Sequence, residues 1–214
     1  MSKLFAIAFL AFSFTACNSE KNTSETIERQ DAAAGSGATY SVDSSSTITW
    51  VGSKPTGRHT GIFQISEGLL MVADGKITSG KFVIDMASLA NKDLAADPKN
   101  QGMLEGHLKS PDFFDVTKYP TSGFEITSIS PVDSANAGNG NTHMLSGNLT
   151  LKDSTKNVTF PAKVTVDDKS VAASATFPID RTNWGLNYKG PNNPQDWVIS
   201  KTVNISLDLR ATKK

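Results

Sequence analysis

Three histidines and a group of acidic residues are the side chains whose types could serve catalysis or metal binding. His59, His107 and His143 lie far apart in the chain, without the short spacing of metal-ligand motifs. We therefore favour separate surface or hydrogen-bonded histidines over a metal site. Five carboxylates fall between residues 93 and 115, and an acid pair of a glycosidase is one alternative reading of them. Acids around a helix start more often cap the helix or face solvent. The five carboxylates are Asp93, Asp97, Glu105, Asp112 and Asp115.

The motifs of nucleophilic and nucleotide chemistry are absent from the sequence. It has no G-x-S-x-G elbow, no H-E-x-x-H pair, no G-x-x-x-x-G-K-S/T loop and no G-x-G-x-x-G turn. The single cysteine, Cys17, excludes an intramolecular disulfide framework. Lys+Arg and Asp+Glu both total 21, and such a neutral chain argues against a nucleic-acid surface. A binding module is therefore favoured over an enzyme, with no metal or cofactor expected.

The first residues are typical of an exported protein. Residues 4–14 form an apolar run after Lys3, whereas a bilayer span takes about 20 apolar residues. Phe14, Thr15 and Ala16 before Cys17 resemble the lipobox of bacterial lipoproteins, in which the cysteine is lipidated and the peptide is cut before it. We predict a signal peptide over 1–16 and a periplasmic or cell-envelope protein anchored to a membrane through lipidated Cys17. The alternative is an ordinary signal peptide with a chance cysteine.

The next segment differs in composition from the rest of the chain. Residues 17–38 are rich in Ser, Thr, Asn, Glu, Ala and Gly, and Ile27 is the one large apolar residue among them. Such a segment buries too little apolar surface to order itself. We predict a flexible tether over 17–38 and a folded domain over 39–212.

The domain has the pattern of an antiparallel β protein. Apolar and polar residues alternate with period two in several runs, as in strands with one dry and one wet face. The Asp74-Gly75 pair predicts a tight hairpin. We predict eight strands forming a sandwich or an up-and-down barrel. Their ranges are 42–51, 61–73, 76–85, 123–129, 144–151, 155–166, 170–179 and 198–209.

One region breaks the strand pattern. Asp97 followed by Pro98 is a helix start, and Pro111 ends the helical pattern. Leu104, His107 and Leu108 fall on one face of the predicted helix. We expect a helical lid or plug near 98–110, over one end of the β structure.

The apolar faces of the strands bear on what the interior holds. An eight-stranded barrel is either filled by its own side chains or holds one small ligand. Gly147, Ala162, Ala173 and Ala175 are small residues on the apolar series, which favours a cavity. Its guest would be apolar or amphipathic. The alternative is a filled barrel that docks a partner through its loops, and the least favoured is a hydrolase of envelope material.

Four segments resemble the YceI-like family of lipocalin-like, polyisoprenoid-binding proteins. The most specific is GHLKSPDFFDVTKYP at 106–120, which is similar to the family signature over nearly its whole length. The others are FVID with SL at 82–89, GNLTL with TK at 147–156, and IDRTNWGL at 179–186. In the last, Trp184 stands where the family usually has Phe. All four occur in the family's order.

The resemblance implies an eight-stranded antiparallel lipocalin-like barrel whose hydrophobic channel holds an isoprenoid chain, without catalysis. No nucleic-acid partner is expected, and a homodimer is left open. Arg181 is a candidate for a head group at the channel mouth or for an ion pair, and His107 for a head group or a strand carbonyl. Phe113 and Phe114 are adjacent, so in an extended segment they point in opposite directions and one of them should pack into the barrel. The candidate ligand-binding residues are Trp50, Lys54, His59, Phe63, Phe82, His107, Phe113, Phe114, Phe160, Phe177, Arg181 and Trp184.

Overall fold

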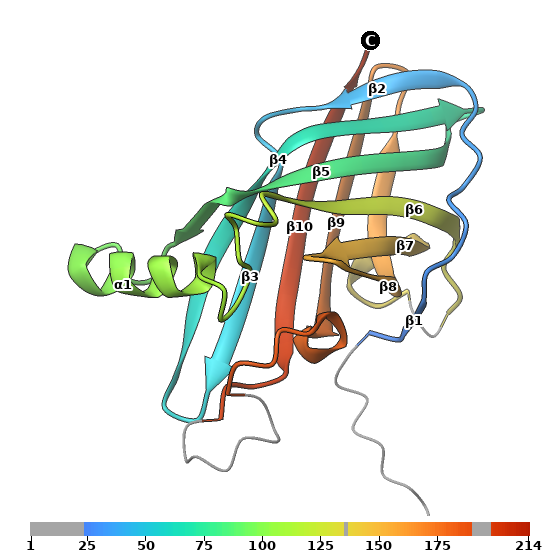
Figure 1. Cartoon of the computed structure of the whole chain (residues 1–214). Helices are drawn as coiled ribbons and strands as arrows, with labels where there is room; N and C mark the ends of the chain where they lie inside the picture. The colour runs from blue at the N-terminus through green and yellow to red at the C-terminus, as the bar shows by residue number, and fades with distance from the viewer. Residues whose placement is uncertain (1–23, 135–136, 190–197) are drawn as a thin grey trace, which may run out of the picture.

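The computed structural model, which describes residues 24–134, 137–189 and 198–214, is a closed antiparallel barrel (Figure 1). The signal peptide and Cys17 lie outside the described residues. The strands are β1 Thr26–Glu28, β2 Ala38–Val42, β3 Thr47–Lys54, β4 Gly57–Ala73, β5 Lys76–Asn91, β6 Thr121–Pro131, β7 His143–Leu151, β8 Ser154–Val166, β9 Ser170–Asp180 and β10 Thr202–Lys213. The helices are α1 Pro98–Lys109 and the short 3₁₀ turns η1 Gly138–Gly140 and η2 Arg181–Trp184.

Eight positions close the barrel although ten strand segments are present. From β4 to β10 each strand pairs with the next, and β10 closes the circle by pairing with both β2 and β3. β2 and β3 share one position because both also pair with β4. The predicted eight-stranded antiparallel barrel is confirmed, and β1 is an addition outside the circle on β8.

The predicted strand at 42–51 is split into β2 and β3. Buried Ser46 bridges the break: its Oγ donates to the Arg210 carbonyl at 3.1 Å and accepts from the Arg210 N–H at 3.0 Å. A side chain thus makes the two bonds that a strand backbone would have made, and the chain turns at 43–46 without opening the barrel.

Helix α1 begins and ends as the sequence predicts but does not plug the barrel. Asp97 caps it by accepting from the Asn100 N–H at 3.2 Å, and Pro98 is its first residue. No residue of α1 is buried, and the helix lies beside the end of β5, to one side of the barrel (Figure 1). The expectation of a lid over the barrel end is therefore wrong. The helix lies at the side of the barrel, where Leu104, His107 and Leu108 form part of the wall of the cavity described below.

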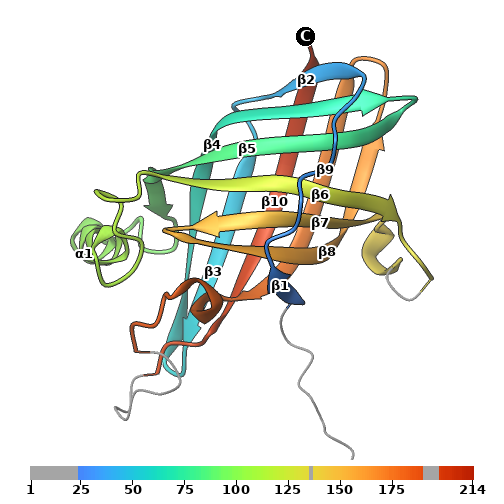
Figure 2. The same ribbon diagram turned by 45° about the vertical axis from the view of Figure 1, so that its right-hand side comes forward.

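The predicted flexible tether is wrong for residues 24–38. Residues 24–37, here called the strap, run along the outside of the barrel from β1 up to β2 (Figure 2). Gln30 exchanges two bonds with the Asn148 side chain, at 3.0 and 2.7 Å. The Ala33 N–H donates to the Ile126 carbonyl at 2.9 Å, and Ser36 bonds Thr78. The strap is thus held by hydrogen bonds from its backbone. A segment with few large apolar residues can still form such bonds, so its composition did not reveal that it is ordered.

The start of the strap covers a gap in the barrel wall. β8 and β9 pair only from Lys163 to Val166, and their other halves diverge. β1 pairs with β8 at residues 156–158, while the Ser24 N–H donates to the Pro178 carbonyl of β9 at 2.8 Å. Inside the gap, Phe160 and Phe177 stack with ring centroids 3.7 Å apart. The wall is therefore closed by the strap outside and by aromatic rings inside.

Replacing Asn148 by Ala should loosen the strap. Asn148 is 3 % exposed, holds both polar groups of the Gln30 backbone and accepts from the buried Asn157 side chain at 3.1 Å, so its loss removes all three hydrogen bonds. We expect the free energy of unfolding to fall by about 1–3 kcal/mol and trypsin to cut faster after Arg29. The matched control is Asn204→Ala, on the exposed face of β10. Unchanged cleavage after Arg29 in Asn148→Ala would contradict the role given to this side chain.

Candidate functional site

A cavity of about 640 Å³ runs inside the barrel. Its lining residues are buried or half-buried except for Ser53, Lys54 and Gly57, which lie at the β3–β4 hairpin. The cavity therefore opens at this end, here called the mouth, which is completed by α1 and by the chain after η2. Its inner end is lined by Leu70, Ile77 and other apolar residues near the opposite end of the barrel.

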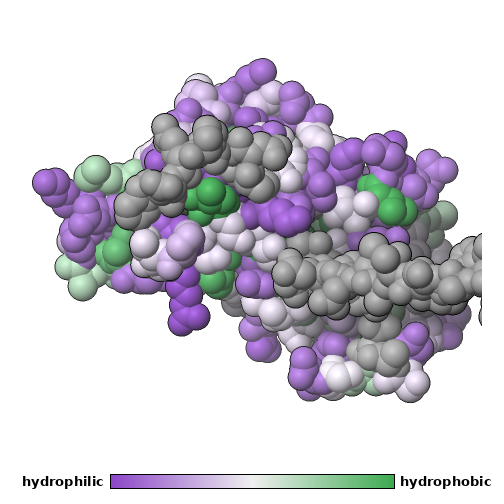
Figure 3. Space-filling view, turned by 90° about the horizontal axis from the view of Figure 1, so that it is seen from below, coloured by the Kyte–Doolittle hydropathy of each residue, from purple (hydrophilic) through white to green (hydrophobic). Residues whose placement is uncertain are grey.

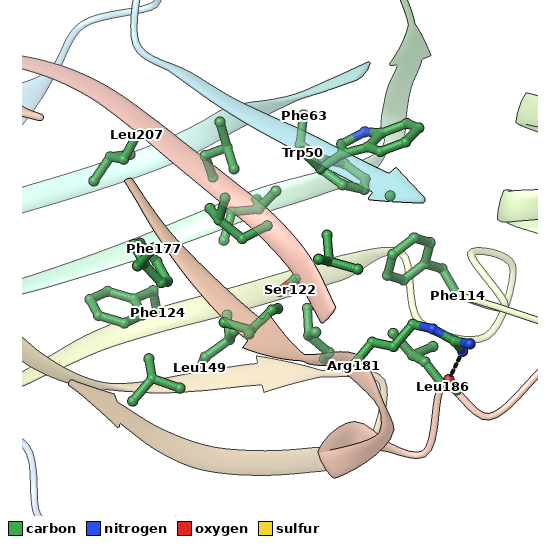
Figure 4. A pocket seen from close by; sticks show the side chains of 18 of the residues that line it. Trp50, Phe63, Phe114, Ser122, Phe124, Leu149, Phe177, Arg181, Leu186 and Leu207 are labelled. Atoms are coloured by element: carbon green, nitrogen blue, oxygen red, sulfur yellow. Dashed lines mark hydrogen bonds between the residues drawn. The ribbon is translucent and has the colours of Figure 1, made fainter. Parts of the chain in front are cut away.

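The predicted alternation is what lines this cavity. The apolar members of β7, β8, β9 and β10 face inward, and Figure 4 shows Leu149, Phe177 and Leu207 pointing into the same space from three strands. Of the candidate ligand-binding residues, all but Trp184 line the cavity. The lining also contains residues outside that candidate set, among them Ile48, Ile65, Phe124, Tyr188 and Ile199.

Only one of the small residues on the apolar series contributes open space. Ala173 lines the cavity, whereas Ala162 and Ala175 are buried without lining it. At Gly147 a Cβ atom would lie 2.1 Å from the Phe124 ring, so the glycine makes room for an aromatic side chain rather than for a ligand. The argument that small residues leave space for a ligand therefore holds at Ala173. It is wrong at Gly147, where the space is filled by Phe124.

Polar groups of the lining gather at the mouth. They belong to Ser53, Lys54, His59, His107, Arg181, Tyr188 and Lys189, while the deeper lining is apolar except for Ser122. The Ser122 Oγ donates to the Thr150 carbonyl at 2.5 Å, so its proton is used by the barrel itself. The cavity thus has an apolar interior and one polar end.

Aromatic side chains form one wall of the mouth. Phe113 contacts the rings of His107 and Tyr188, each with centroids 5.2 Å away, and Phe114 meets Phe63 edge-on at 5.6 Å. Both Phe113 and Phe114 line the cavity, so the expectation that they point in opposite directions is wrong. The expectation assumed an extended segment, whereas residues 111–114 form a turn.

Two histidine–carboxylate pairs border the mouth. The Nδ1 of His59 lies 2.8 Å from an oxygen of Asp93, and the Nε2 of His107 lies 3.1 Å from an oxygen of Asp112. Burial alone would raise the pKa of the Asp93 carboxyl. Hydrogen bonds from the Thr60 backbone, His59 and Asn91 outweigh it and lower this pKa to about 2. Asp93 therefore ties β4 to the turn after β5 in its ionised form.

The lowered pKa of Asp93 predicts a stability change in acid. A carboxyl whose pKa is depressed in the folded state stabilises the fold above its unfolded pKa and loses that contribution as pH falls through its folded pKa. We expect Asp93 to contribute to this loss between about pH 4 and its folded pKa of about 2. Urea unfolding at several pH values should show a smaller decline there for Asp93→Asn than for the unmodified chain. The exposed Asp168→Asn is the control, and equal declines in both variants would contradict the assignment.

Arg181 is a structural side chain at the mouth. It is 4 % exposed, and its Nε donates to the Ser200 carbonyl at 3.0 Å. Its terminal nitrogens donate to the carbonyls of Tyr188 and Ile199 at 3.1 and 3.0 Å and to that of Leu186, as Figure 4 shows. Burial lowers the pKa of its guanidinium, and Asp180 opposes that change. Four of its five N–H groups hold the chain around the mouth, where the sequence suggested a head group or an ion pair.

The two tryptophans of this region have different surroundings. Trp184 is 1 % exposed and donates to the Leu149 carbonyl at 2.9 Å, which fastens η2 to β7 outside the cavity lining. Trp50 lies in the lining, where a Cβ at Gly61 would be 2.4 Å from its ring, so only glycine lets the ring lie across β4. The buried indole N–H of Trp50 has no hydrogen-bond partner among the described residues.

Four of the five carboxylates considered for catalysis are used by the fold. Asp97 caps α1, Glu105 accepts from the Asn91 N–H at 2.7 Å, and Asp93 and Asp112 pair with histidines. Within residues 24–134, 137–189 and 198–214, no three His, Cys, Asp or Glu side chains come together as metal ligands would. The same residues contain no helix long and apolar enough to cross a membrane.

Known proteins are similar to this chain in sequence or in fold. A UPF0312 protein of Pseudomonas putida is 26 % identical over 147 residues, which is 63 % of this chain and 70 % of that protein. A UPF0312 protein of Pseudomonas aeruginosa is 40 % identical over 65 residues, 30 % of each chain. BcnA of Burkholderia cenocepacia superposes with a TM-score of 0.63 at 24 % identity, over 80 % of this chain and 99 % of BcnA.

A polyisoprenoid-binding domain from Saccharophagus degradans, implicated in plant cell wall breakdown, has the same fold. It superposes with a TM-score of 0.57 at 19 % identity, over 82 % of this chain and 98 % of that domain. The family model of the YceI-like domain matches residues 40–211, which run from within β2 to within β10. The chain therefore belongs to the YceI-like domain family.

Proposed function

We propose that this protein binds a long-chain isoprenoid lipid, a polyprenyl or quinone-like molecule, in its barrel cavity and does no covalent chemistry on it. The observation that carries the proposal is the distribution of polarity along the lining: an apolar interior of about 640 Å³ with its polar groups at the mouth. Such a shape takes an amphipathic ligand with its chain inside and its head outside. The polyisoprenoid-binding domain of similar fold supports the choice of chain.

Burial of the chain supplies the affinity and the mouth supplies the head-group preference. Each methylene of the ligand removed from water contributes about 0.8 kcal/mol before the costs of binding are subtracted. Lys54, Lys189 and the two histidine–carboxylate pairs are the charged groups that a head group would meet. A filled barrel that only docks partners is the weaker alternative, because the cavity is open.

We also propose that the protein is an exported lipoprotein, attached to a membrane of the cell envelope through lipidated Cys17. The support is the sequence alone: a short apolar run after Lys3, then Thr15, Ala16 and the chain's single cysteine. Several acyl chains on one cysteine give a lasting anchor, whereas one chain gives marginal binding. The intact mass of the exported chain, with Cys17→Ser as the control, tests this part separately.

The binding proposal is tested by exporting residues 17–214 with Cys17→Ser, behind a cleavable secretion signal, to a bacterial envelope. Native mass spectrometry then measures adducts, and lipid extraction identifies them. We expect a stable adduct with a polyprenyl or quinone mass. The apo protein is then titrated with polyprenol and with ubiquinone, because the expression host need not contain the native lipid. An empty extract together with no binding in the titration would overturn the proposal.

A further inference from the structure

We infer that the mouth of the barrel docks against the lipid bilayer that anchors the protein, because the strap shortens the connection to Cys17 and begins near the mouth. This inference rests on the proposed anchoring through Cys17. It names the interaction surface and its partner, which the binding proposal leaves open.

The first step concerns the length of chain between Cys17 and the first described residue that bonds to the barrel. The sequence predicts a tether of about twenty residues, but the strap is bound to the barrel from Ser24 onward. Seven peptide steps therefore separate Cys17 from Ser24, the first described residue that bonds to the barrel. Fully extended, they reach about 25 Å, and as a flexible coil they span roughly 15 Å.

The second step concerns where this short connection begins. The Ser24 N–H donates to the Pro178 carbonyl of β9. Pro178 is two residues from Asp180, where β9 ends at the mouth, and eight residues from Ser170, where β9 begins at the far end. Along the strand these separations are about 7 Å and 26 Å. A coil of seven steps keeps the anchor within reach of the mouth end but short of the far end.

The third step concerns what the mouth presents. In the space-filling view of this end, apolar side chains reach the surface among polar ones (Figure 3). Met103 on the exposed face of α1, beside the mouth, is 65 % exposed, more than any other large apolar residue among those described. Lys54 and Lys189 border the same opening. Basic side chains interspersed with exposed apolar ones suit the head-group region of a bilayer.

The experiment couples the chain to vesicles through its own thiol. Residues 17–214 are attached through Cys17 to a maleimide lipid in vesicles of phosphatidylethanolamine and phosphatidylglycerol, so the native lipidation step is not needed. A photo-crosslinking benzoylphenylalanine replaces Thr56, at the tip of the β3–β4 hairpin, or Asp168, at the tip of the β8–β9 hairpin. Both positions are exposed, and they lie at opposite ends of the barrel.

We expect lipid adducts at position 56 and few at position 168. Inserting thirty Gly/Ser residues after Asn22 should lower the adduct yield at position 56 by roughly tenfold, since effective concentration falls steeply with tether length. Equal yields at the two positions, or a yield at position 56 that does not respond to the insertion, would overturn the inference. The vesicles contain no isoprenoid, so this result is independent of whether the cavity binds one.

Discussion

Substitution of Ala173 by Trp should weaken the binding of long-chain isoprenoids by roughly seventyfold. Ala173 lines the deep part of the cavity, paired with Val164 on β8 and Leu209 on β10. A Trp there occupies the space of one isoprene unit. Excluding about 100 Å² of ligand surface at ~25 cal/mol per Å² costs about 2.5 kcal/mol. The added ring enters existing space, so the barrel should stay folded.

The measurement is a titration of apo protein with polyprenols of different chain lengths, followed by fluorescence or calorimetry. The loss of affinity caused by Ala173→Trp should grow with the chain length of the polyprenol, because a short chain does not reach Ala173. Ala172→Trp is the matched control, because Ala172 directly precedes Ala173 on β9 and its side chain is exposed. Equal affinities of Ala173→Trp and the unmodified chain for the longest polyprenol would show that the ligand does not use this cavity.

Substitution of Arg181 by Met should lower the free energy of unfolding by about 3–5 kcal/mol. The guanidinium serves the carbonyls of Leu186, Tyr188, Ile199 and Ser200, and Met leaves all four without this donor. Arg181→Lys should recover only a part of the loss, because one ammonium cannot reach carbonyls on both sides of the planar fork. Urea unfolding monitored by circular dichroism measures both variants.

The control for Arg181 is Arg210→Met, whose side chain is 62 % exposed and 4.0 Å from Asp208. This change should alter the free energy of unfolding by less than about 1 kcal/mol. The result that would refute the structural role is an Arg181→Met variant of unchanged stability that has lost its lipid. Arg181 would then be a head-group residue, as the sequence allowed.

The strands were predictable because their pattern has a simple physical cause. In a closed barrel one face of each strand is dry, so Leu145, Leu149 and Leu151 alternate with residues that face solvent or the strap. The same alternation predicts the part of the cavity lining that β7, β8, β9 and β10 supply. Helix α1 was equally readable, since Asp97 and Pro98 form a local start signal that does not depend on the rest of the fold.

The mouth and the strap follow from contacts that no local pattern encodes. Tyr188 and Ile199 reach the cavity from an irregular segment, where neither period two nor period 3.6 applies. The strap is held by hydrogen bonds to Asn148 and Thr78, more than forty residues away in the chain, so its composition suggests a free tether. The role of Arg181 was unpredictable for the same reason. The sequence shows a guanidinium with five N–H donors, but only the fold shows which carbonyls accept from them.

The pairing of the first strands with the last sets the order in which the chain can fold. β2 pairs with β10, with Tyr40 opposite Lys213, and β1 pairs with β8. Neither of these pairings can form until the later strand has been synthesised. Contacts of such large sequence separation make folding slow. A chain that emerges from the ribosome N-terminus first therefore carries its opening strands without partners until its last residues are made. For the export proposed here this delay is useful, because it leaves the polypeptide threadable through a secretion channel before the barrel closes.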